Sequence, residues 1–356
     1  MWLSRRFPKN LDLPLVTFTL LLAVWGVAVI YSATRASGGD PLAFVRSRLV
    51  HLAVGLVAMG VMAALDYRGL ARAWRVLYVL NLALLVWVLV AGRTSLGAQR
   101  WISVGPLGTL QPSEFAKLIL IITLAQHLAL RREPPATPLQ FAPYLLHVGV
   151  PMFLIFRQPD LGTSLVCLAI LFGMLSAAGA RPRHLLALAG IGMALTPVLW
   201  HLLKDYQRRR LLIFLDPTVD PLGSGYAVIQ SKIAVGSGLL TGKGVFKGTQ
   251  TLLQFVPERH TDFIFTVVGE EMGFVGSMVL LLLFLLWLWR GLTLAAEARD
   301  RVGTLMGVGV VSMIAFHLFV NVGMTVGLMP ITGIPLPFLS YGGSALLTAL
   351  MGTGLL

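Results

Sequence analysis

Long runs of apolar residues, separated by short polar segments, constrain this chain more than any other feature. A helix needs about 20 apolar residues to cross the hydrocarbon core of a bilayer. Runs of that kind lie at 13–32, 49–65, 73–91, 113–130, 142–157, 161–179, 184–203, 263–289, 302–326 and 338–356. The pattern predicts an all-α integral membrane protein with about ten transmembrane helices, forming a single polytopic domain over residues 1–356.

Composition and charge support the same fold class. Hydrophobic residues make up 56% of the 356 residues and charged residues only 12%, whereas soluble domains carry about 25% charged residues. The formal net charge of +13 comes from basic residues in short loops between apolar runs, where they mark cytoplasmic sides and contact anionic lipids. No basic stripe with interleaved aromatic residues is present, so we expect membrane lipids and no nucleic acid as partners.

The distribution of Lys and Arg also predicts the orientation. Basic residues are more frequent on the segments that are cytoplasmic if the N-terminus is inside, beginning with Arg5, Arg6 and Lys9. Both termini are then cytoplasmic. The polar segments 92–112 and 204–262, and the proline-rich segment 327–340, face outside. We therefore expect a large extracytoplasmic loop at 204–262, and we expect any chemistry on the outer face.

Polar residues gather before and within the fourth apolar run. Arg100 and Trp101 lie in the preceding segment, and Pro112 suits the start of a helix. Glu114 in the first turn is typical of a helix cap, which is the structural alternative to a functional site. Lys117 is harder to explain structurally, because a lysine inside a span is costly unless it is paired or lines a cavity.

Two further candidates lie on outside segments. Asp160 ends a tight turn before the sixth run, where an aspartate is commonly a helix cap. Lys232 lies in 224–233, which we expect to form an amphipathic helix on the membrane, with its ammonium group near phosphate or lipid headgroups. The nearby Gly242-Lys243-Gly244 does not fit the Walker pattern, so a nucleotide site is not predicted.

Three carboxylates, Asp262, Glu270 and Glu271, lie at the beginning of the eighth run. Carboxylates are expensive near lipid and commonly mark a function. The structural alternative is a helix cap at Asp262, with Glu270 and Glu271 paired to basic neighbours. The functional interpretation is that Asp262 acts as a general base on a sugar hydroxyl. No zinc-binding pattern or serine triad is visible.

Together these motifs resemble the SEDS family (shape, elongation, division and sporulation), most closely its RodA branch, along essentially the whole chain. The segments that match are Arg100-Trp101-Ile102, Gln111 to Lys117, Gln158 to Thr163, Ile229 to Gly238, Glu258 to Phe265, and Gly333 to Phe338 with Ser340 to Gly343.

The resemblance implies a glycosyltransferase that polymerises lipid II into peptidoglycan strands on the outer face of the bacterial cytoplasmic membrane during cell elongation. The implied partner is a class B penicillin-binding protein, a transpeptidase, which we expect to contact the eighth and ninth spans. The essential aspartate of the family falls on Asp262. A divalent cation, Mg or Mn, is implied as cofactor, although the sequence offers no ligand set for one.

The resemblance also assigns substrate contacts. The family's loop Arg-Trp pair falls on Arg100 and Trp101, its Glu and Lys of the fourth span on Glu114 and Lys117, and its loop aspartate on Asp160. Two other functions fit the same sequence: a transporter that flips lipid II, and a non-catalytic scaffold for the transpeptidase. Ten spans with intramembrane charges suit a transporter as well.

Overall fold

The computed structural model describes residues 11–35, 40–95, 98–103, 109–131, 133–135, 137–220 and 223–356; Arg5, Arg6 and Lys9 lie outside them. Each predicted apolar run is helical. The corresponding helices are α1 (Leu13–Thr34), α2 (Pro41–Ala64), α4 (Trp74–Ala91), α5 (Pro112–Ala129), α6 (Pro138–Arg157), α7 (Leu161–Ala177), α8 (Pro182–Ala194) with α9 (Thr196–Leu202), α13 (Ile264–Ala296), α14 (Arg301–Val326) and α15 (Gly343–Leu355).

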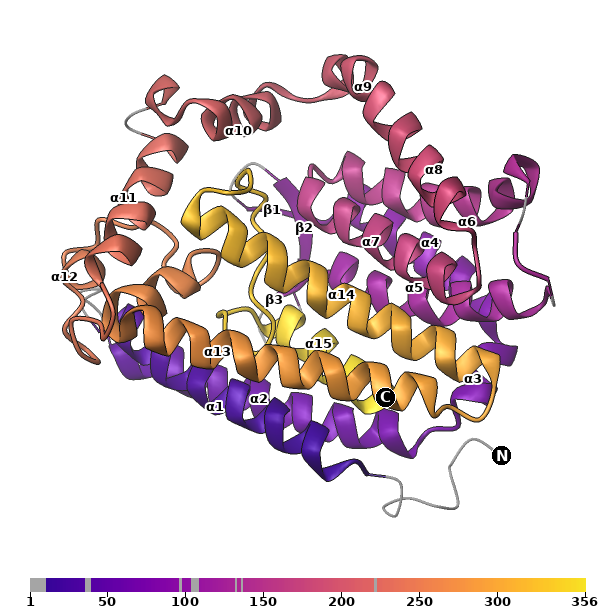
Figure 1. Cartoon of the computed structure of the whole chain (residues 1–356), viewed down its shortest axis with the longest axis horizontal. Coiled ribbons are helices and arrows are strands. Elements are labelled where there is room, and N and C mark those ends of the chain that lie inside the picture. Colours follow the sequence, from indigo (N-terminus) through magenta and orange to yellow (C-terminus); the bar gives the residue numbers. More distant parts are fainter. Residues whose placement is uncertain are drawn as a thin grey trace.

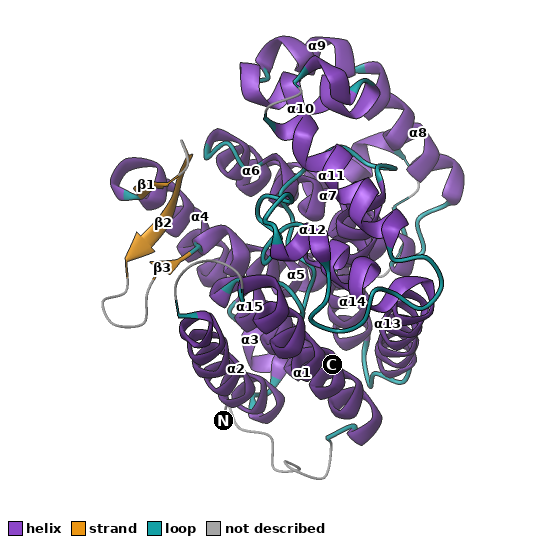
Figure 2. Ribbon diagram, turned by 90° about the vertical axis from the view of Figure 1, so that its left-hand side faces the viewer, coloured by secondary structure: helices purple, strands orange, loops and turns teal. Residues whose placement is uncertain are grey.

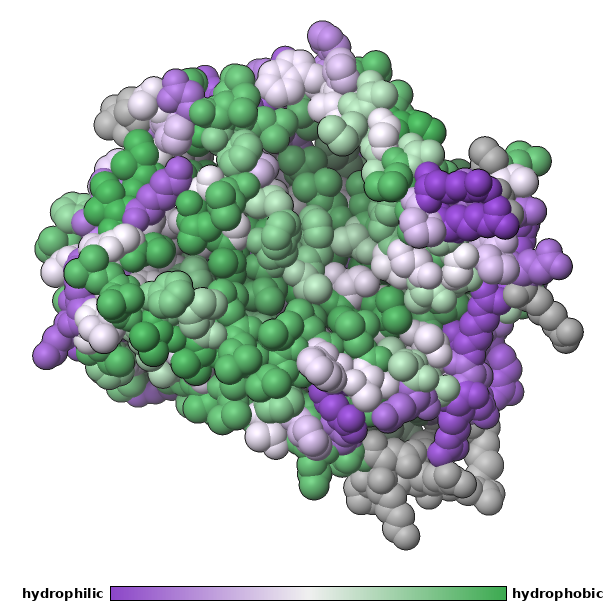
Figure 3. Space-filling view, in the orientation of Figure 1, coloured by the Kyte–Doolittle hydropathy of each residue, from purple (hydrophilic) through white to green (hydrophobic). Residues whose placement is uncertain are grey.

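In the described part of the chain, six helices are long and apolar enough to cross a membrane: α1, α2, α4, α6, α13 and α14. Helices α7 and α15 are apolar but shorter. An apolar band covers the face formed by α13 and α14, while hydrophilic side chains gather mainly toward the ends of the molecule (Figure 3). The fold is therefore an all-α membrane protein with several candidate spans.

The structure adds detail that the sequence did not predict. The seventh run is interrupted at Leu195 into α8 and α9, which form an arch with α10 (Asp205–Leu215) along one edge of the molecule (Figure 1). Segment 204–262 also contains a 3₁₀ turn (Pro217–Val219), α11 (Ser224–Ser237) and α12 (Thr249–Leu252). The predicted helix at 224–233 is confirmed as part of α11.

Segment 92–112 forms a small antiparallel sheet beside α4 (Figure 2). Its strands are β1 (Arg93–Ser95), β2 (Ala98–Ser103) and β3 (Thr109–Leu110), in the order β1-β2-β3. Arg93 pairs with Trp101, and Ile102 pairs with Leu110. Because β3 ends two residues before Pro112, the sheet connects directly to the start of α5.

Several helices begin where an aspartate side chain accepts a hydrogen bond from a backbone N–H of the first turn. These caps are Asp12 for α1, Asp40 for α2, Asp66 for α3 (Tyr67–Arg72), Asp160 for α7 and Asp300 for α14. The structural interpretation of Asp160 as a cap is thus confirmed. Proline at the first positions of α1, α2, α5, α6 and α8 fits the same starts, because a proline there costs no intrahelical bond.

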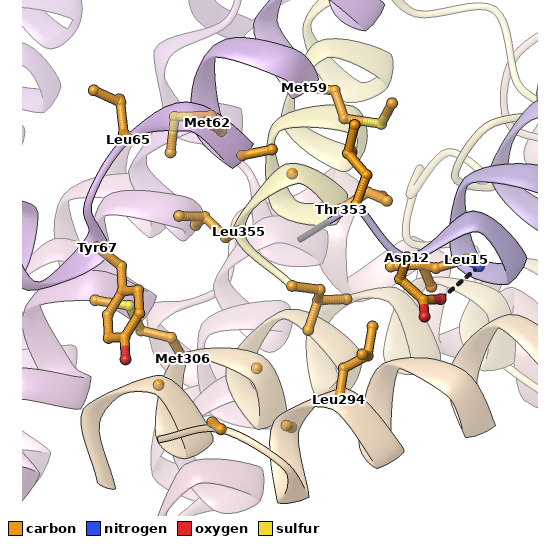
Figure 4. A pocket seen from close by; sticks show the side chains of 18 of the residues that line it. Asp12, Leu15, Met59, Met62, Leu65, Tyr67, Leu294, Met306, Thr353 and Leu355 are labelled. Atoms are coloured by element: carbon orange, nitrogen blue, oxygen red, sulfur yellow. Dashed lines mark hydrogen bonds between the residues drawn. The ribbon is translucent and has the colours of Figure 1, made fainter. Parts of the chain in front are cut away.

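The helix ends gather at two opposite sides of the bundle. On one side, the start of α1 and the ends of α2, α13 and α15 surround a cavity of about 470 Å³ (Figure 4). Asp12, Met59, Met62 and Leu355 line it, and none of the predicted site residues does. On the other side lie the starts of α2, α5, α7, α13 and α15, and there the predicted site residues are found.

Helix α13 is broken near its beginning, at Gly273, where φ is +64°. The N–H groups of 274–275 donate to carbonyls of segment 239–244, and N–H groups of that segment donate to the carbonyls of 270–271, at 2.8 to 3.0 Å. Glycine is needed because a Cβ there would lie 2.3 Å from the nitrogen of Gly242. The exchange satisfies backbone groups that lipid could not satisfy.

Candidate active site

Asp262 lies in the loop just before α13 and is partly exposed. Its main-chain carbonyl accepts a hydrogen bond from Asn321 Nδ2 of α14 at 2.8 Å. Among the described residues, no hydrogen bond reaches its carboxylate. The proposed helix cap at Asp262 is wrong, because the residue that precedes α13 is Phe263 and no side chain caps this helix. The backbone of Asp262 is therefore fixed by Asn321, and its carboxylate remains available to a substrate.

The surroundings of Asp262 raise the pKa of its carboxyl group to about 6. Burial is the main cause, because removal of water disfavours the charged form, and the nearby carboxylate of Glu258 adds to it. Arg210 and Arg100 act in the opposite direction. A carboxylate with a pKa close to neutral is well matched to accept a proton from a substrate hydroxyl.

Arg210, from α10, faces the same space as Asp262. A Cβ built on Gly333 would lie 3.3 Å from Asp262 Oδ2 and 3.6 Å from Arg210 Nη1, so both side chains approach this glycine. The guanidinium lies 5.8 Å from the ring of Tyr206, one helical turn earlier, whose hydroxyl donates to Pro159 O at 2.8 Å. Helix α10 of the arch therefore places the guanidinium of Arg210 near the carboxylate of Asp262.

Asp160 gathers a second polar cluster at the start of α7. Its Oδ2 accepts from Gln111 Nε2 at 2.9 Å and lies 3.8 Å from Arg100 Nη1. Its Oδ1 accepts from Thr163 N at 3.1 Å, and Ser113 Oγ is 3.5 Å from Oδ2. Asp160 is 5% exposed, so the carboxylate mainly fixes β2 and the start of α5 against α7.

Glu114 and Lys117 form a buried ion pair on α5, at 2.9 Å. Lys117 Nζ also lies 2.9 Å from His317 Nε2 of α14, and His317 Nδ1 lies 3.0 Å from Pro335 O. Because Lys117 is a donor only, His317 is neutral here, with its proton on Nδ1. Of the two possibilities for Lys117, pairing or lining a cavity, the structure shows pairing, and the lysine is 1% exposed.

The Lys117 cluster lies one helical turn deeper than Asp262. His317 contacts Pro335 while Asn321, four residues later on α14, bonds Ile334 O at 2.8 Å. Four residues correspond to about 6 Å along a helix. The α5 ion pair and the aspartate therefore share one side of α14 and one loop.

Trp101 and Lys232 complete the predicted site residues. Trp101 is a partly exposed residue of β2. Lys232, on α11, lies against the last turn of α14: a Cβ on Gly327 would be 2.5 Å from its Nζ. Gly327 ends α14 with φ +80°, and a cation near a helix C-terminus is stabilised by the helix dipole. The structure thus gives Lys232 a structural partner; its substrate contact stays a prediction.

Glu270 and Glu271 have structural partners. Glu270 pairs with Lys243 at 2.9 Å, as the structural interpretation expected. Glu271 instead accepts from Ser32 Oγ at 2.5 Å. Both carboxylates hold segment 243–251 and α1 against the broken part of α13.

Comparison with known proteins identifies the family. Residues 13–356 match the model of FtsW, RodA and SpoVE, described as "Cell cycle protein". The chain belongs to the FtsW/RodA/SpoVE family. It is 42% identical over 349 residues to the peptidoglycan glycosyltransferase MrdB of Escherichia coli (strain K12), covering 97% of this chain and 92% of the relative. It is also 40% identical over 354 residues to the stage V sporulation protein E of Bacillus subtilis (strain 168), covering 97% and 95%. The resemblance stated from the motifs is confirmed.

Solved structures of the FtsW/RodA/SpoVE family have the same fold. One, described as showing structural coordination of polymerization and crosslinking by a peptidoglycan synthase complex, has a TM-score of 0.82 at 35% identity, covering 97% of this chain and 96% of that one. The crystal structure of the rod shape determining protein RodA of Thermus thermophilus has a TM-score of 0.72 at 32% identity, covering 98% and 96%.

The divalent cation implied for the family finds no resident site in the part of the chain that the structure describes. There, no three His, Cys, Asp or Glu side chains come close enough to hold a metal ion. Around Asp262, Glu258 and Asp160 are the acidic neighbours, and Arg210 and Arg100 oppose them. The described residues around Asp262 do not fit a protein-held metal.

Sequence reasoning missed three polar residues that complete this FtsW/RodA/SpoVE site. His317 and Asn321 lie four apart in the ninth apolar run, so they share a helix face, and that spacing was a usable signal. Arg210 ends the run Arg208-Arg209-Arg210. Nothing in the sequence distinguishes it from its two neighbours, because the arch alone decides which arginine faces Asp262.

Proposed function

We propose that this chain is a peptidoglycan glycosyltransferase that polymerises lipid II into glycan strands during cell elongation. Membership of the FtsW/RodA/SpoVE family and the similarity to MrdB support this function. The observation that carries the mechanism is the state of Asp262: a partly exposed carboxylate with a pKa raised to about 6, and with cations beside it. That combination is suited to proton abstraction followed by stabilisation of an anionic leaving group.

In the proposed reaction, Asp262 accepts the proton of the 4-hydroxyl of the acceptor GlcNAc. The oxygen attacks C1 of a donor MurNAc, and undecaprenyl pyrophosphate leaves with the bonding electron pair. Arg210 and Arg100 act on Asp262 electrostatically and are both partly exposed, so they can meet the pyrophosphate. Lys117 is buried in its ion pair, so we assign it to holding α5 against α14 beneath the substrate.

The topology belongs to the same proposal. Ten spans, counting α8 with α9 as one, put both termini in the cytoplasm and segment 204–262 outside the bacterial cytoplasmic membrane. Asp262, Asp160 and Arg210 lie on one side of the bundle, which agrees with a site on the outer face. Polyprenyl tails would remain in the lipid around the helices.

The partner and the cation are also part of the proposal. A class B penicillin-binding protein would cross-link the strands; the likeness to a chain of a peptidoglycan synthase complex supports a partner of this kind. We expect this partner to contact α13 and α14, the eighth and ninth spans. Gly307 of α14 is not a suitable probe of that contact, because a Cβ there would lie 2.6 Å from Ala295 Cβ inside the chain. A requirement for Mg or Mn stays a prediction, tested by titrating each metal into the polymerisation assay.

The test is polymerisation of labelled lipid II in detergent by the purified protein with its partner. Detergent removes the two compartments that flipping needs, so polymer can come only from an enzyme. We expect Asp262→Asn to lower the rate by about 10²- to 10⁴-fold, the usual contribution of a general base. Absence of polymer from the wild-type protein under every divalent-ion condition would favour the flippase or the scaffold. Full activity of Asp262→Asn would exclude the proposed base.

A further inference from the structure

The backbone around Asp262 is tied to two separate parts of the molecule. Asn321 Nδ2 donates both to Asp262 O and to Ile334 O, each at 2.8 Å, and the residue is completely buried. One residue earlier, Thr261 O accepts from Ser340 Oγ at 2.6 Å. The backbone of residues 261–262 is thus hydrogen-bonded both to α14 and to segment 334–341.

Segment 334–341 has an irregular backbone and needs support of its own. Phe338 has φ +64°, and its carbonyl and that of Ser340 point toward α2. Ser340 Oγ also accepts from Leu336 N at 2.8 Å. Tyr341 N donates to His260 O at 2.8 Å, so the segment is bonded to the chain just before Asp262 at two points.

Arg48 of α2 provides that support. Its Nη1 donates to Ser340 O at 2.9 Å, and its Nη2 donates to Phe338 O. The side chain is 1% exposed, and its Nε has no partner among the described residues. Within the described part of the chain no carboxylate pairs with it, so its charge is balanced only by carbonyl dipoles.

Such an arrangement is costly. Burial of an unpaired cation in a low-dielectric interior is unfavourable by several kcal/mol, and an arginine inside a membrane span commonly has a functional reason. A planar guanidinium that bonds two carbonyls at once fixes both their distance and their orientation. Arg48 therefore defines the shape of the segment from which Thr261 and Asp262 are held.

We infer that Arg48 and Asn321 are positioning residues for Asp262: together they fix the backbone that presents its carboxylate to the acceptor hydroxyl. Arg48 acts through Ser340 and Thr261, and Asn321 acts directly on Asp262 O. The inference rests on the proposed function of Asp262 as the base. Displacement of a reacting group by about 1 Å can cost about 10²-fold in rate, so loss of either residue should act on the chemical step.

The experiment measures kcat, KM and the pH profile of lipid II polymerisation for Arg48→Met and Asn321→Leu in the complex with the partner. We expect kcat to fall by about 10- to 100-fold with KM changed by less than about threefold. Loss of either residue should also expose Asp262 to more water, which lowers the pKa of its carboxyl group. The acid limb of the pH profile of kcat should therefore move to lower pH. Arg48→Lys, which keeps one donor and the charge, should recover part of kcat.

Arg301→Gln is the matched control. Arg301 also donates to two main-chain carbonyls, Arg131 O at 2.8 Å and Ala178 O at 3.1 Å, but at the opposite end of α14. We expect this variant to keep wild-type kcat and pH profile. An equal loss of kcat in Arg301→Gln would mean that the variants act by general destabilisation, and it would overturn the inference. An acid limb that does not shift in Arg48→Met and Asn321→Leu would overturn it as well.

Two further outcomes separate the inference from the function on which it rests. Wild-type kcat in folded Arg48→Met and Asn321→Leu, together with inactive Asp262→Asn, would overturn the positioning role and leave the glycosyltransferase intact. Active Asp262→Asn would instead remove the proposed base. If Arg48→Met does not fold, Asn321→Leu and Arg48→Lys decide the question, because the first leaves Arg48 in place and the second keeps the charge and one donor.

Discussion

Asp262 and Glu270 lie eight residues apart, at the beginning of the same span, but their carboxylates differ in the hydrogen bonds that they accept. Glu270 is completely buried, and its carboxylate accepts from Lys243 Nζ, from the N–H groups of Gln250 and Thr251, and from the hydroxyls of Thr249 and Thr251. Among the described residues, the carboxylate of Asp262 accepts none. Its main chain is bonded instead.

The difference separates a structural carboxylate from a reactive one. Five donors fix Glu270 as an anion and leave it no capacity for a proton from a substrate. Its bonds hold segment 243–251 against the break in α13. Asp262 has the reverse arrangement: a rigid backbone, a free side chain, and a pKa raised to about 6 by burial. Both carboxylates are expensive near lipid, but only one is available for chemistry.

The largest expected effect on stability is that of Glu270→Ala. Removal of a buried, multiply bonded carboxylate takes the ion pair from Lys243 and leaves two N–H groups without their acceptor, and we expect a loss of about 3 kcal/mol in the free energy of unfolding. Asp262→Ala removes no side-chain hydrogen bond and should cost less than about 1 kcal/mol. Thermal unfolding in detergent measures both. A greater loss for Asp262→Ala than for Glu270→Ala would reverse the comparison.

The second expected effect concerns pH and activity. Because a general base must be ionised, kcat/KM should fall as the pH drops through about 6, to about one tenth of its plateau near pH 5. A pH series of the polymerisation rate tests this. Glu270→Gln, if it folds, should keep the acid limb of the kcat/KM profile at the same pH, because Glu270 takes no part in the proton transfer. A rate that stays constant from pH 8 to pH 5 would contradict the assignment of Asp262.

The smallest expected effect is a gain in stability. The folded protein raises the pKa of Asp262 from about 3.8 to about 6, so between these values it binds more protons than the unfolded chain. Stability from this group is therefore lost as the pH rises through that window. The full rise in pKa corresponds to about 3 kcal/mol, and solvent screening of this partly exposed group lowers the expected gain in stability of Asp262→Asn at pH 8 to about 1–2 kcal/mol, with no difference below about pH 3. Equal Tm values at pH 8 would argue against a strained carboxylate.

Much of the site was predictable from local pattern. The cap at Asp160 follows from residue preference at helix ends, and the pairing of Glu114 with Lys117 follows from their three-residue spacing. The cap considered for Glu114 is wrong, because no side chain caps α5 and the carboxylate pairs with Lys117 instead. The motifs also identified the family. By contrast, the structural alternative of a helix cap at Asp262 was wrong, because Phe263 is the residue that precedes α13 and no side chain caps this helix.

The sequence by itself determined that this chain is a membrane protein, where its helices lie, and that Asp262 is the candidate base. Apolar runs and helix caps are local properties that survive without knowledge of the neighbours. Only the tertiary structure decided which of the carboxylates is saturated and which is free. Hydrogen bonds from Lys243 to Glu270, or from Arg48 to the segment behind Asp262, join residues far apart in the chain. Burial and bonding across the fold, and not residue type, set the chemistry of each group.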